Sequence, residues 1–422
     1  MNAGMTTIRF AVAGVAVVVL MAAPASQGNG WRANPDVVAR TSKGRPQFNY
    51  EEARVKPYEL PDPLVTGKGR IRTLAEWSVR RAEILELFRA NVYGRRPGKP
   101  AQLRFETIEE QPSAMEGAAT LKRVAVHSAQ GGRTHRFDLT IFLPNAVKGT
   151  APLFLLINNR APNLADPARG TRSGFWPAEA LIARGYAIAA LQYGDLAPDN
   201  GDKFREGVMR LFEGTTTGDR APDAWAALAA WGWGASRAMD YFETDERIDA
   251  ARVAIVGHSR GGKAALWAGA EDDRFALVIS NESGEGGAAL TRRMFGETLG
   301  RITESFPHWF APRYATFAGR EETLPVDQHM LIALVAPRGV YVASADQDLW
   351  SDPRGEFLGL AHASPVYALW GARPIKTDDM PPLDSPLVVG RRGYHVRSGV
   401  HDLTLWDWER YAEFGDGLWK RR

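Results

Sequence analysis

Residues 251–287 read ARVAIVGHSRGGKAALWAGAEDDRFALVISNESGEGG, and this stretch decides the fold. The apolar run 252–257 is typical of a strand buried on both faces, and the alanine-rich run that follows is typical of a helix. Gly257, Ser259 and Gly261 lie at the junction in the pattern Gly-x-Ser-x-Gly. A sharp turn from strand to helix leaves little space beside the serine, so small residues belong two positions before and after it. We therefore expect Ser259 to expose its hydroxyl there as a nucleophile, rather than to serve only as a turn residue.

Similar apolar runs recur along the chain and alternate with helical stretches. They are LFLLIN (153–158), YAIAALQY (186–193), FALVIS (275–280) and GVYVAS (339–344). This alternation predicts a mostly parallel central sheet sandwiched by helices. Before it come three strand-like runs at 103–108, 121–128 and 135–144, of which the last two alternate as a hairpin does. The predicted fold is therefore α/β, of the α/β-hydrolase type, with antiparallel strands at the N-terminal edge.

The N-terminal residues predict an exported protein. Arg9 precedes an apolar run at 10–23 and the sequence Ala23-Pro24-Ala25, which together are typical of a secretory signal. The run is shorter than the roughly 20 residues that span a bilayer. We expect residues 1–25 to be a signal peptide, with the mature protein in the periplasm or secreted. Residues 26–70 are expected to form an extended N-terminal arm, and residues 71–422 a single catalytic domain.

Composition excludes several classes of function. The 422 residues contain no cysteine, which excludes disulfides, thiolate metal sites and a cysteine nucleophile. Removing the signal removes Arg9 and leaves 51 basic against 49 acidic residues, a balance that favours neither nucleic acid nor a membrane surface as partner. The sequence contains no convincing metal-ligand spacing and no glycine-rich phosphate loop. We predict no cofactor, no metal and a monomer.

A nucleophilic serine needs a histidine base, which in this fold follows the acid in the chain. The chain has eight histidines, His127, His135, His258, His308, His329, His362, His395 and His401. His258 adjoins the serine but is expected to point elsewhere. His401 lies in a loop before the last helical stretch, just where the base belongs, and we favour it over His395. The last core strand is expected at PLVVG (386–390).

The acid has two candidates. Glu282 follows the run FALVIS, and Asp348 follows the run GVYVAS, which is the usual position. Either carboxylate could orient the imidazole and stabilise its cation. Each is also explained as an ordinary loop or turn residue, and Asp346 is a further alternative to Asp348. The residues alone do not decide between Glu282 and Asp348.

Several motifs resemble one family. GHSRGGK (257–263), ESGEGG (282–287), RRMFGET (292–298) and DLWSDPRGEF (348–357) are similar to those of bacterial glucuronoyl esterases of carbohydrate esterase family fifteen. The resemblance covers roughly residues 150–415. It implies an α/β-hydrolase that cleaves esters between 4-O-methyl-glucuronic acid on xylan and lignin alcohols. It also implies Ser259 as nucleophile, His401 as base and Glu282 as acid, with Asp348 as a second acid.

The resemblance implies further site residues. Arg260 would stabilise the oxyanion, Lys263 and Glu297 would hold sugar hydroxyls, and Trp350 would line the pocket. A cation is unfavourable at a helix N-terminus, so Arg260 and Lys263 suggest a use beyond solvation. Some members of the family, especially fungal ones, have a disulfide-bonded cysteine where this chain has His258. Packing must therefore hold the histidine loop here.

Two other functions fit the same machinery less well. The first is an acetyl-xylan esterase or another carbohydrate esterase on this fold, against which the Arg260 and Lys263 pair argues mildly. The second is a carbohydrate-binding protein without catalysis, which the filled catalytic positions disfavour. In each of these readings the partner is a carbohydrate, with glucuronoxylan or a lignin–carbohydrate ester as the expected substrate.

Overall fold

The computed structural model describes residues 1, 30–215 and 218–419. The predicted signal peptide, residues 1–25, lies outside the described residues except for Met1. No helix in the described ranges is long and apolar enough to cross a membrane.

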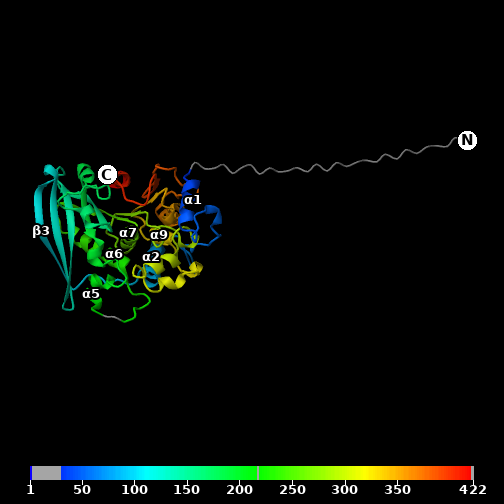
Figure 1. Ribbon diagram of the computed structural model, residues 1–422, viewed down its shortest axis with the longest axis horizontal. Helices are drawn as coiled ribbons and strands as arrows, with labels where there is room; N and C mark the ends of the chain where they lie inside the picture. The colour runs from blue at the N-terminus through cyan, green and yellow to red at the C-terminus, as the bar shows by residue number, and fades with distance from the viewer. Residues whose placement is uncertain (2–29, 216–217, 420–422) are drawn as a thin grey trace.

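The part of the chain that the structure describes contains a ten-stranded sheet in the order β11-β12-β10-β9-β8-β6-β7-β5-β4-β3. The strands are β3 Gln102–Ala114, β4 Ala119–Gln130, β5 Arg133–Pro144, β6 Ala151–Asn158, β7 Ala187–Gln192, β8 Ile248–His258, β9 Leu277–Asn281, β10 Gly339–Ala345, β11 Leu387–Val389 and β12 Arg392–Arg397. Strands β7, β6, β8, β9, β10 and β12 pair in parallel, whereas β11 is antiparallel to β12. Strands β3, β4 and β5 are antiparallel and form one end of the molecule (Figure 1). The predicted sheet, with antiparallel strands at its N-terminal edge, is confirmed.

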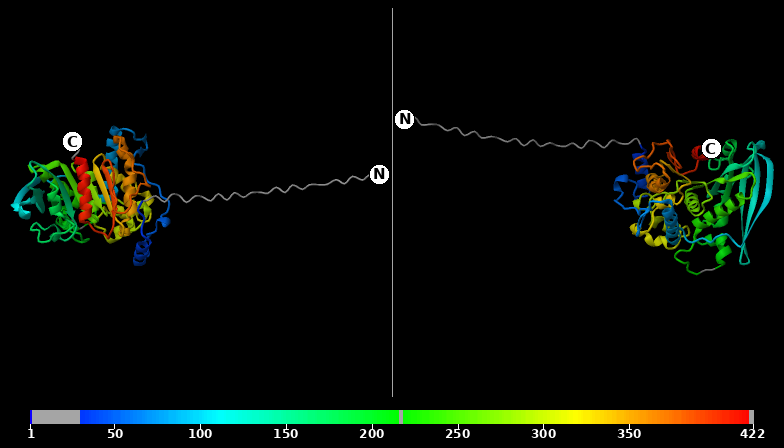
Figure 2. Two further views of the ribbon diagram at one scale, coloured as in Figure 1. Left: turned by 90° about the horizontal axis from the view of Figure 1, so that it is seen from above. Right: turned by 180° about the vertical axis from the view of Figure 1, so that it is seen from behind.

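Helices cover both faces of this sheet. The larger apolar cluster contains side chains of α2 Leu74–Phe88, α4 Tyr193–Leu196, α5 Val208–Glu213, α6 Ala227–Phe242, α7 Arg260–Glu271, α8 Leu299–Ser305, α9 Gln328–Ala333, α10 Pro353–His362 and α11 Ser364–Tyr367. The second cluster contains side chains of α3 Ala178–Ala183 and α12 Leu405–Trp419. Figure 2 shows α12, in red, lying along the sheet.

The position of β6 inside the sheet explains the unbroken apolar sequence of this strand. Leu153, Leu155 and Ile157 belong to the larger cluster, and Phe154 and Leu156 belong to the second. Successive side chains of a strand point to opposite faces, so a sheet covered on both sides needs apolar residues at every position. The core therefore holds the strand ends rigidly, and the loops that follow them can carry chemistry.

Strand register brings distant loops together. His258 at the end of β8 is level with Asn281 of β9, which in turn is level with Ala343 of β10. Ala345 is level with Arg397 at the end of β12. The residues that follow these strands therefore meet at one edge of the sheet. The predicted last core strand is wrong, because PLVVG forms the antiparallel edge strand β11 and the neighbouring RGYHVR forms the parallel strand β12.

The N-terminal arm is less extended than predicted. Residues 35–44 form helix α1, Pro35–Gly44, because the Asn34 side chain caps it and Pro35 suits its first turn. The arm also contains a short hairpin, β1 Val65–Thr66 with β2 Gly69–Arg70. It lies at the end of the molecule opposite β3, as the blue segment in Figure 1 shows. The division of the chain at residue 71 stays a prediction.

Candidate active site

Ser259 lies in a strained turn between β8 and α7. Its φ of 56° and ψ of −125° are unusual for a residue with a side chain. The turn is possible because a Cβ on Gly257 would lie 2.0 Å from the carbonyl oxygen of Gly261. The serine is half-buried, and its backbone N–H donates to Asn281 O across 2.9 Å. The strain and the close approach are those expected where a turn presents a nucleophile.

His401 lies in the loop between β12 and α12. Its Nδ1 lies 2.6 Å from an oxygen of Asp348 and 3.2 Å from an oxygen of Glu282. A carboxylate only accepts, so Nδ1 carries the proton and Nε2 is the nitrogen that can take another. His395 is fully buried in β12, where it bonds Asp407 at 2.9 Å. The structure therefore brings His401, and not His395, to the candidate acids.

The two acids differ in their other partners. Asp348 follows β10 and has its shortest contact with His401. Glu282 follows β9 and also accepts from Arg397 Nη2 at 2.7 Å and from the backbone N–H of Asp402 at 3.2 Å. Glu282 is therefore shared between the histidine and the backbone of the histidine loop, whereas Asp348 is directed at the imidazole.

Burial and charge shift the acidities in this group. Burial raises the pKa of Glu282 to about 8, although His401 and Arg397 act against it. Burial also works to raise the pKa of Asp348, but the attraction of His401 outweighs it and lowers that pKa. Burial works to lower the pKa of His401, and the charge of Asp348 reverses this and raises it. Asp348 is therefore the carboxylate that stays ionised beside the imidazole.

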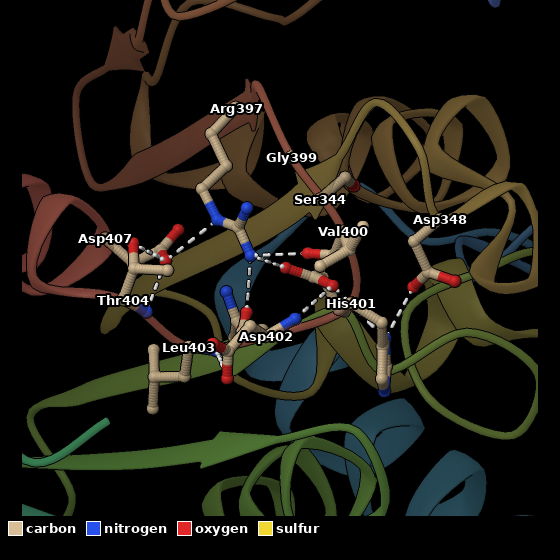
Figure 3. A network of polar contacts seen from close by, with 12 residues as sticks. Ser344, Asp348, Arg397, Gly399, Val400, His401, Asp402, Leu403, Thr404 and Asp407 are labelled. Atoms are coloured by element: carbon tan, nitrogen blue, oxygen red, sulfur yellow. Dashed lines mark hydrogen bonds and ion pairs between the residues drawn. The ribbon is translucent and has the colours of Figure 1, made fainter. Parts of the chain in front are cut away.

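Arg397 holds the histidine loop, which the sequence did not reveal. Its Nη2 donates to Val400 O at 2.9 Å and Asp402 O at 2.7 Å, and its Nε donates to Asp407 at 3.0 Å (Figure 3). Both flanks of His401 are thus fixed to one buried guanidinium. The available signal was a charged residue at the end of the buried strand β12.

His258 was expected to point away from the site, and this is wrong. Its ring centroid lies 4.4 Å from that of His401. Its nitrogens contact Asn281 Oδ1 at 2.6 Å and Arg160 at 3.1 Å. The ring is fully buried, and this burial places the His258 pKa well below its usual value. A neutral ring therefore packs against the proposed base.

Arg260 begins helix α7, and its guanidinium donates to Asp199. The guanidinium carbon lies 4.8 Å from the ring centroid of Trp309. Asp199 was not found from the sequence, because it lies 61 residues before Arg260 in a loop without a recognisable motif.

The predicted sugar-binding residues lie close to one another. Lys263 is almost fully buried and donates to the carbonyl of Ser283. Burial lowers the pKa of Lys263, although the charge of Glu297 acts against this. Glu297 is half-buried, and its side chain bonds that of Trp350. The Trp350 ring is covered by Arg45 of the N-terminal arm, whose guanidinium carbon lies 4.0 Å from the ring centroid. The arm therefore packs against this group of residues.

One group in the described residues has the spacing of a metal site. Glu282, Asp348 and His401 each offer a ligand atom within 4.8 Å of the others. The same three atoms form the hydrogen bonds of a catalytic acid and base. The sequence predicts no metal here, and the arrangement can orient an imidazole without one.

Comparisons with known proteins point to one family. A family model described as "Glucuronyl esterase, fungi" matches residues 126–371. The carbohydrate esterase MZ0003 from an unknown prokaryotic organism is 41% identical over 418 residues, covering 92% of this chain and 94% of that protein. The 4-O-methyl-glucuronoyl methylesterase of Schizophyllum commune is 29% identical and covers 74% of each chain. The solved glucuronoyl esterase from Solibacter usitatus has a TM-score of 0.81 at 41% identity, covering 87% of this chain and 100% of that one, which confirms the predicted α/β-hydrolase fold.

Proposed function

This chain belongs to the glucuronoyl esterase family and is a carboxylic ester hydrolase, and we propose that it hydrolyses esters of 4-O-methyl-glucuronic acid through an acyl-enzyme on Ser259. The observation that carries the proposal is the pair formed by His401 and Asp348, 2.6 Å apart beside a strained serine turn. Such a constellation is defined by geometry and not by sequence position.

The proposed reaction has two halves. His401 Nε2 takes the Ser259 proton as the serine oxygen bonds to the ester carbon, and a tetrahedral oxyanion forms. The oxyanion collapses, the alcohol leaves with the proton from His401, and the glucuronoyl group stays on Ser259. A water molecule, deprotonated by His401, then attacks the acyl-enzyme and releases glucuronate and the free serine. Arg260 stabilises the oxyanion through its backbone N–H, which follows the nucleophile in the chain, and through its guanidinium.

Asp348 is proposed as the principal acid. Its short bond to His401 and its lowered pKa keep a negative charge beside the imidazolium that forms during the reaction. Glu282 is proposed as a second acid that shares this task and also secures the loop through Arg397. The carboxylates follow β9 and β10, which lie side by side in the sheet, so one imidazole can reach both.

The acyl side of the substrate is proposed to lie on Lys263, Glu297 and Trp350. A charged donor, a carboxylate acceptor and an indole match the hydroxyls and the flat face of a sugar ring. The alcohol must lie near His401, which returns the proton to it. A cavity of about 510 Å³ lies beside His401 and is lined in part by Arg160 and Phe175. This cavity has room for a bulky alcohol part of the ester. We propose the lignin–glucuronoxylan ester cross-link as the natural substrate, and we propose that the protein acts as an exported monomer.

The test is hydrolysis of benzyl glucuronate by the mature protein, beside 4-nitrophenyl acetate and acetylated xylan. Preference for the glucuronate ester, abolished by Ser259→Ala, is expected. Turnover of the acetates alone would retain the nucleophile and replace the substrate assignment with that of an acetyl-xylan or related esterase. Binding of glucuronoxylan fragments without turnover of any ester would favour a carbohydrate-binding protein.

A further inference from the structure

Asp199 receives an unusual set of donors next to the serine turn. One oxygen accepts from Trp309 Nε1 at 2.7 Å and from His308 Nε2 at 2.8 Å. The other accepts from the Arg260 guanidinium and from the Tyr193 hydroxyl at 3.3 Å. The Asp199 side chain is only 10% exposed, so these contacts take the place of water.

This environment keeps Asp199 ionised. Burial acts to raise its pKa, but the donors from His308 and Trp309 and the charge of Arg260 outweigh burial and lower that pKa to about 2. Asp199 is therefore negatively charged at every pH where a histidine base can work. A fixed buried anion of this kind orients the cation that it contacts.

Arg260 needs such a partner because of its place in the fold. It is the first residue of α7, where the helix dipole disfavours a positive charge. The rings of Trp309 and Phe306 are stacked, with centroids 3.8 Å apart and nearly parallel planes. The guanidinium carbon lies 4.8 Å from the Trp309 centroid and 5.6 Å from the Phe306 centroid, so the cation packs against a rigid aromatic pair.

The contact with Asp199 does not use every N–H donor of the Arg260 guanidinium. Asp199 engages Nη1, and Nε is buried with no hydrogen-bond partner in the described structure. A guanidinium has five N–H groups, so some of them remain available to donate to an oxyanion.

We propose that Asp199 is a positioning residue, which fixes the Arg260 guanidinium beside Ser259 so that its free N–H groups face the oxyanion of the attacked ester. This rests on the proposed serine esterase mechanism. Asp199 itself does not touch the reacting atoms. Because the oxyanion exists only in the transition state and the intermediate, loss of Asp199 should lower kcat and leave KM nearly unchanged. The effect should not depend on the sugar.

The experiment is a double-mutant cycle of Asp199→Asn and Arg260→Ala, measured with benzyl glucuronate and with 4-nitrophenyl acetate. In the wild-type background, Asp199→Asn should lower kcat about 10- to 100-fold for both esters, a fraction of what one oxyanion donor is worth. In the Arg260→Ala background, it should change kcat less than about 2-fold, because the group it positions is gone. Asp202→Asn, an exposed change in the same loop, is the control and should have no effect.

An equal loss in both backgrounds, an unchanged kcat or an effect on KM alone would overturn the proposal. If Asp199→Asn lowers the thermal unfolding temperature so far that it cannot be assayed, Trp309→Phe decides. That change keeps an aromatic ring under Arg260 but removes one donor to Asp199, and it should lower kcat several-fold only while Arg260 is present. If only the acetate is turned over, the glucuronoyl assignment fails, while the cycle on acetate still tests Asp199.

Discussion

His401 donates from Nδ1 to Asp348 across 2.6 Å. The contact of the same nitrogen with Glu282 is longer, at 3.2 Å, and Glu282 also accepts from Arg397. A single imidazole N–H thus faces two carboxylates, of which one is committed to it and the other is shared. This asymmetry gives the two acids unequal parts and leads to the first prediction.

Asp348→Asn should reduce kcat/KM more than Glu282→Gln does. We expect a loss of about 100-fold or more for the first change, because the orienting acid of a serine triad is worth up to about 10⁴-fold. The loss for Glu282→Gln should be nearer about 10-fold, because Asp348 still orients the ring. The double change should lose far more than either single change. Purely additive or negligible losses would contradict a shared acid.

The pH profile should move in a defined direction. His401 acts as a base only when neutral, so kcat/KM falls on the acid side as the imidazole becomes protonated. The charge of Asp348 raises the His401 pKa. Removing that charge lowers this pKa, so the acid limb of Asp348→Asn should lie at lower pH than that of the wild type. The profile is measured on the residual activity with 4-nitrophenyl acetate, and an acid limb at unchanged or higher pH would rule out the proposed pair.

The proposed reacting groups could be predicted from the sequence because most of them follow a recognisable strand. Ser259 lies between an apolar run and a helix, Glu282 and Asp348 come shortly after buried strands, and His401 comes before the last helix. Parallel strands place such loops at one edge, so order along the chain predicts proximity in space. The choice of His401 over His395 followed from the same order of strands, loops and helices, although PLVVG was wrongly predicted to be the last core strand.

The supporting residues could not be found in this way. Asp199 and Arg397 meet Arg260 and Glu282 only through the tertiary fold, across 61 and 115 residues of sequence. No local period or motif marks a buried ion pair of this kind. His258 was misjudged for a related reason, because the direction of its side chain depends on Asn281 of the neighbouring strand.

Arg397→Met should destabilise the fold as well as the site. The change leaves two buried carboxylates, Glu282 and Asp407, without their shared cation. Breaking such a pair costs about 3 to 5 kcal/mol of unfolding free energy. Urea unfolding measures this loss of free energy. The variant should also lose esterase activity, because the carbonyls of the histidine loop lose the Arg397 guanidinium as their hydrogen-bond donor.

The matched control for Arg397 is Arg301→Ala. Arg301 forms an exposed pair with Glu304, and the loss should be within about 0.5 kcal/mol. Equal stability losses for the two arginine changes would show that the Arg397 network does not hold the loop.

The change Lys263→Met should impair recognition of the sugar without impairing ester hydrolysis itself. Lys263 lies one helical turn after Ser259, near Glu297, and we expect it to bind the uronate ring. A hydrogen bond to a charged group is worth about 1.5 to 3 kcal/mol, so kcat/KM for benzyl glucuronate should fall about 10- to 100-fold. Turnover of 4-nitrophenyl acetate should change much less, because it has no sugar. Lys376→Met, at an exposed position, serves as control, and equal losses on both esters would contradict a sugar contact.

The measurement that tests the central claim most directly compares the wild-type protein with Ser259→Ala on benzyl glucuronate and 4-nitrophenyl acetate. The account predicts that the wild type prefers the glucuronate ester and that the substitution abolishes turnover of both, since the acyl-enzyme cannot form. Full activity of Ser259→Ala on the glucuronate ester would contradict the assignment of the nucleophile and with it the proposed mechanism.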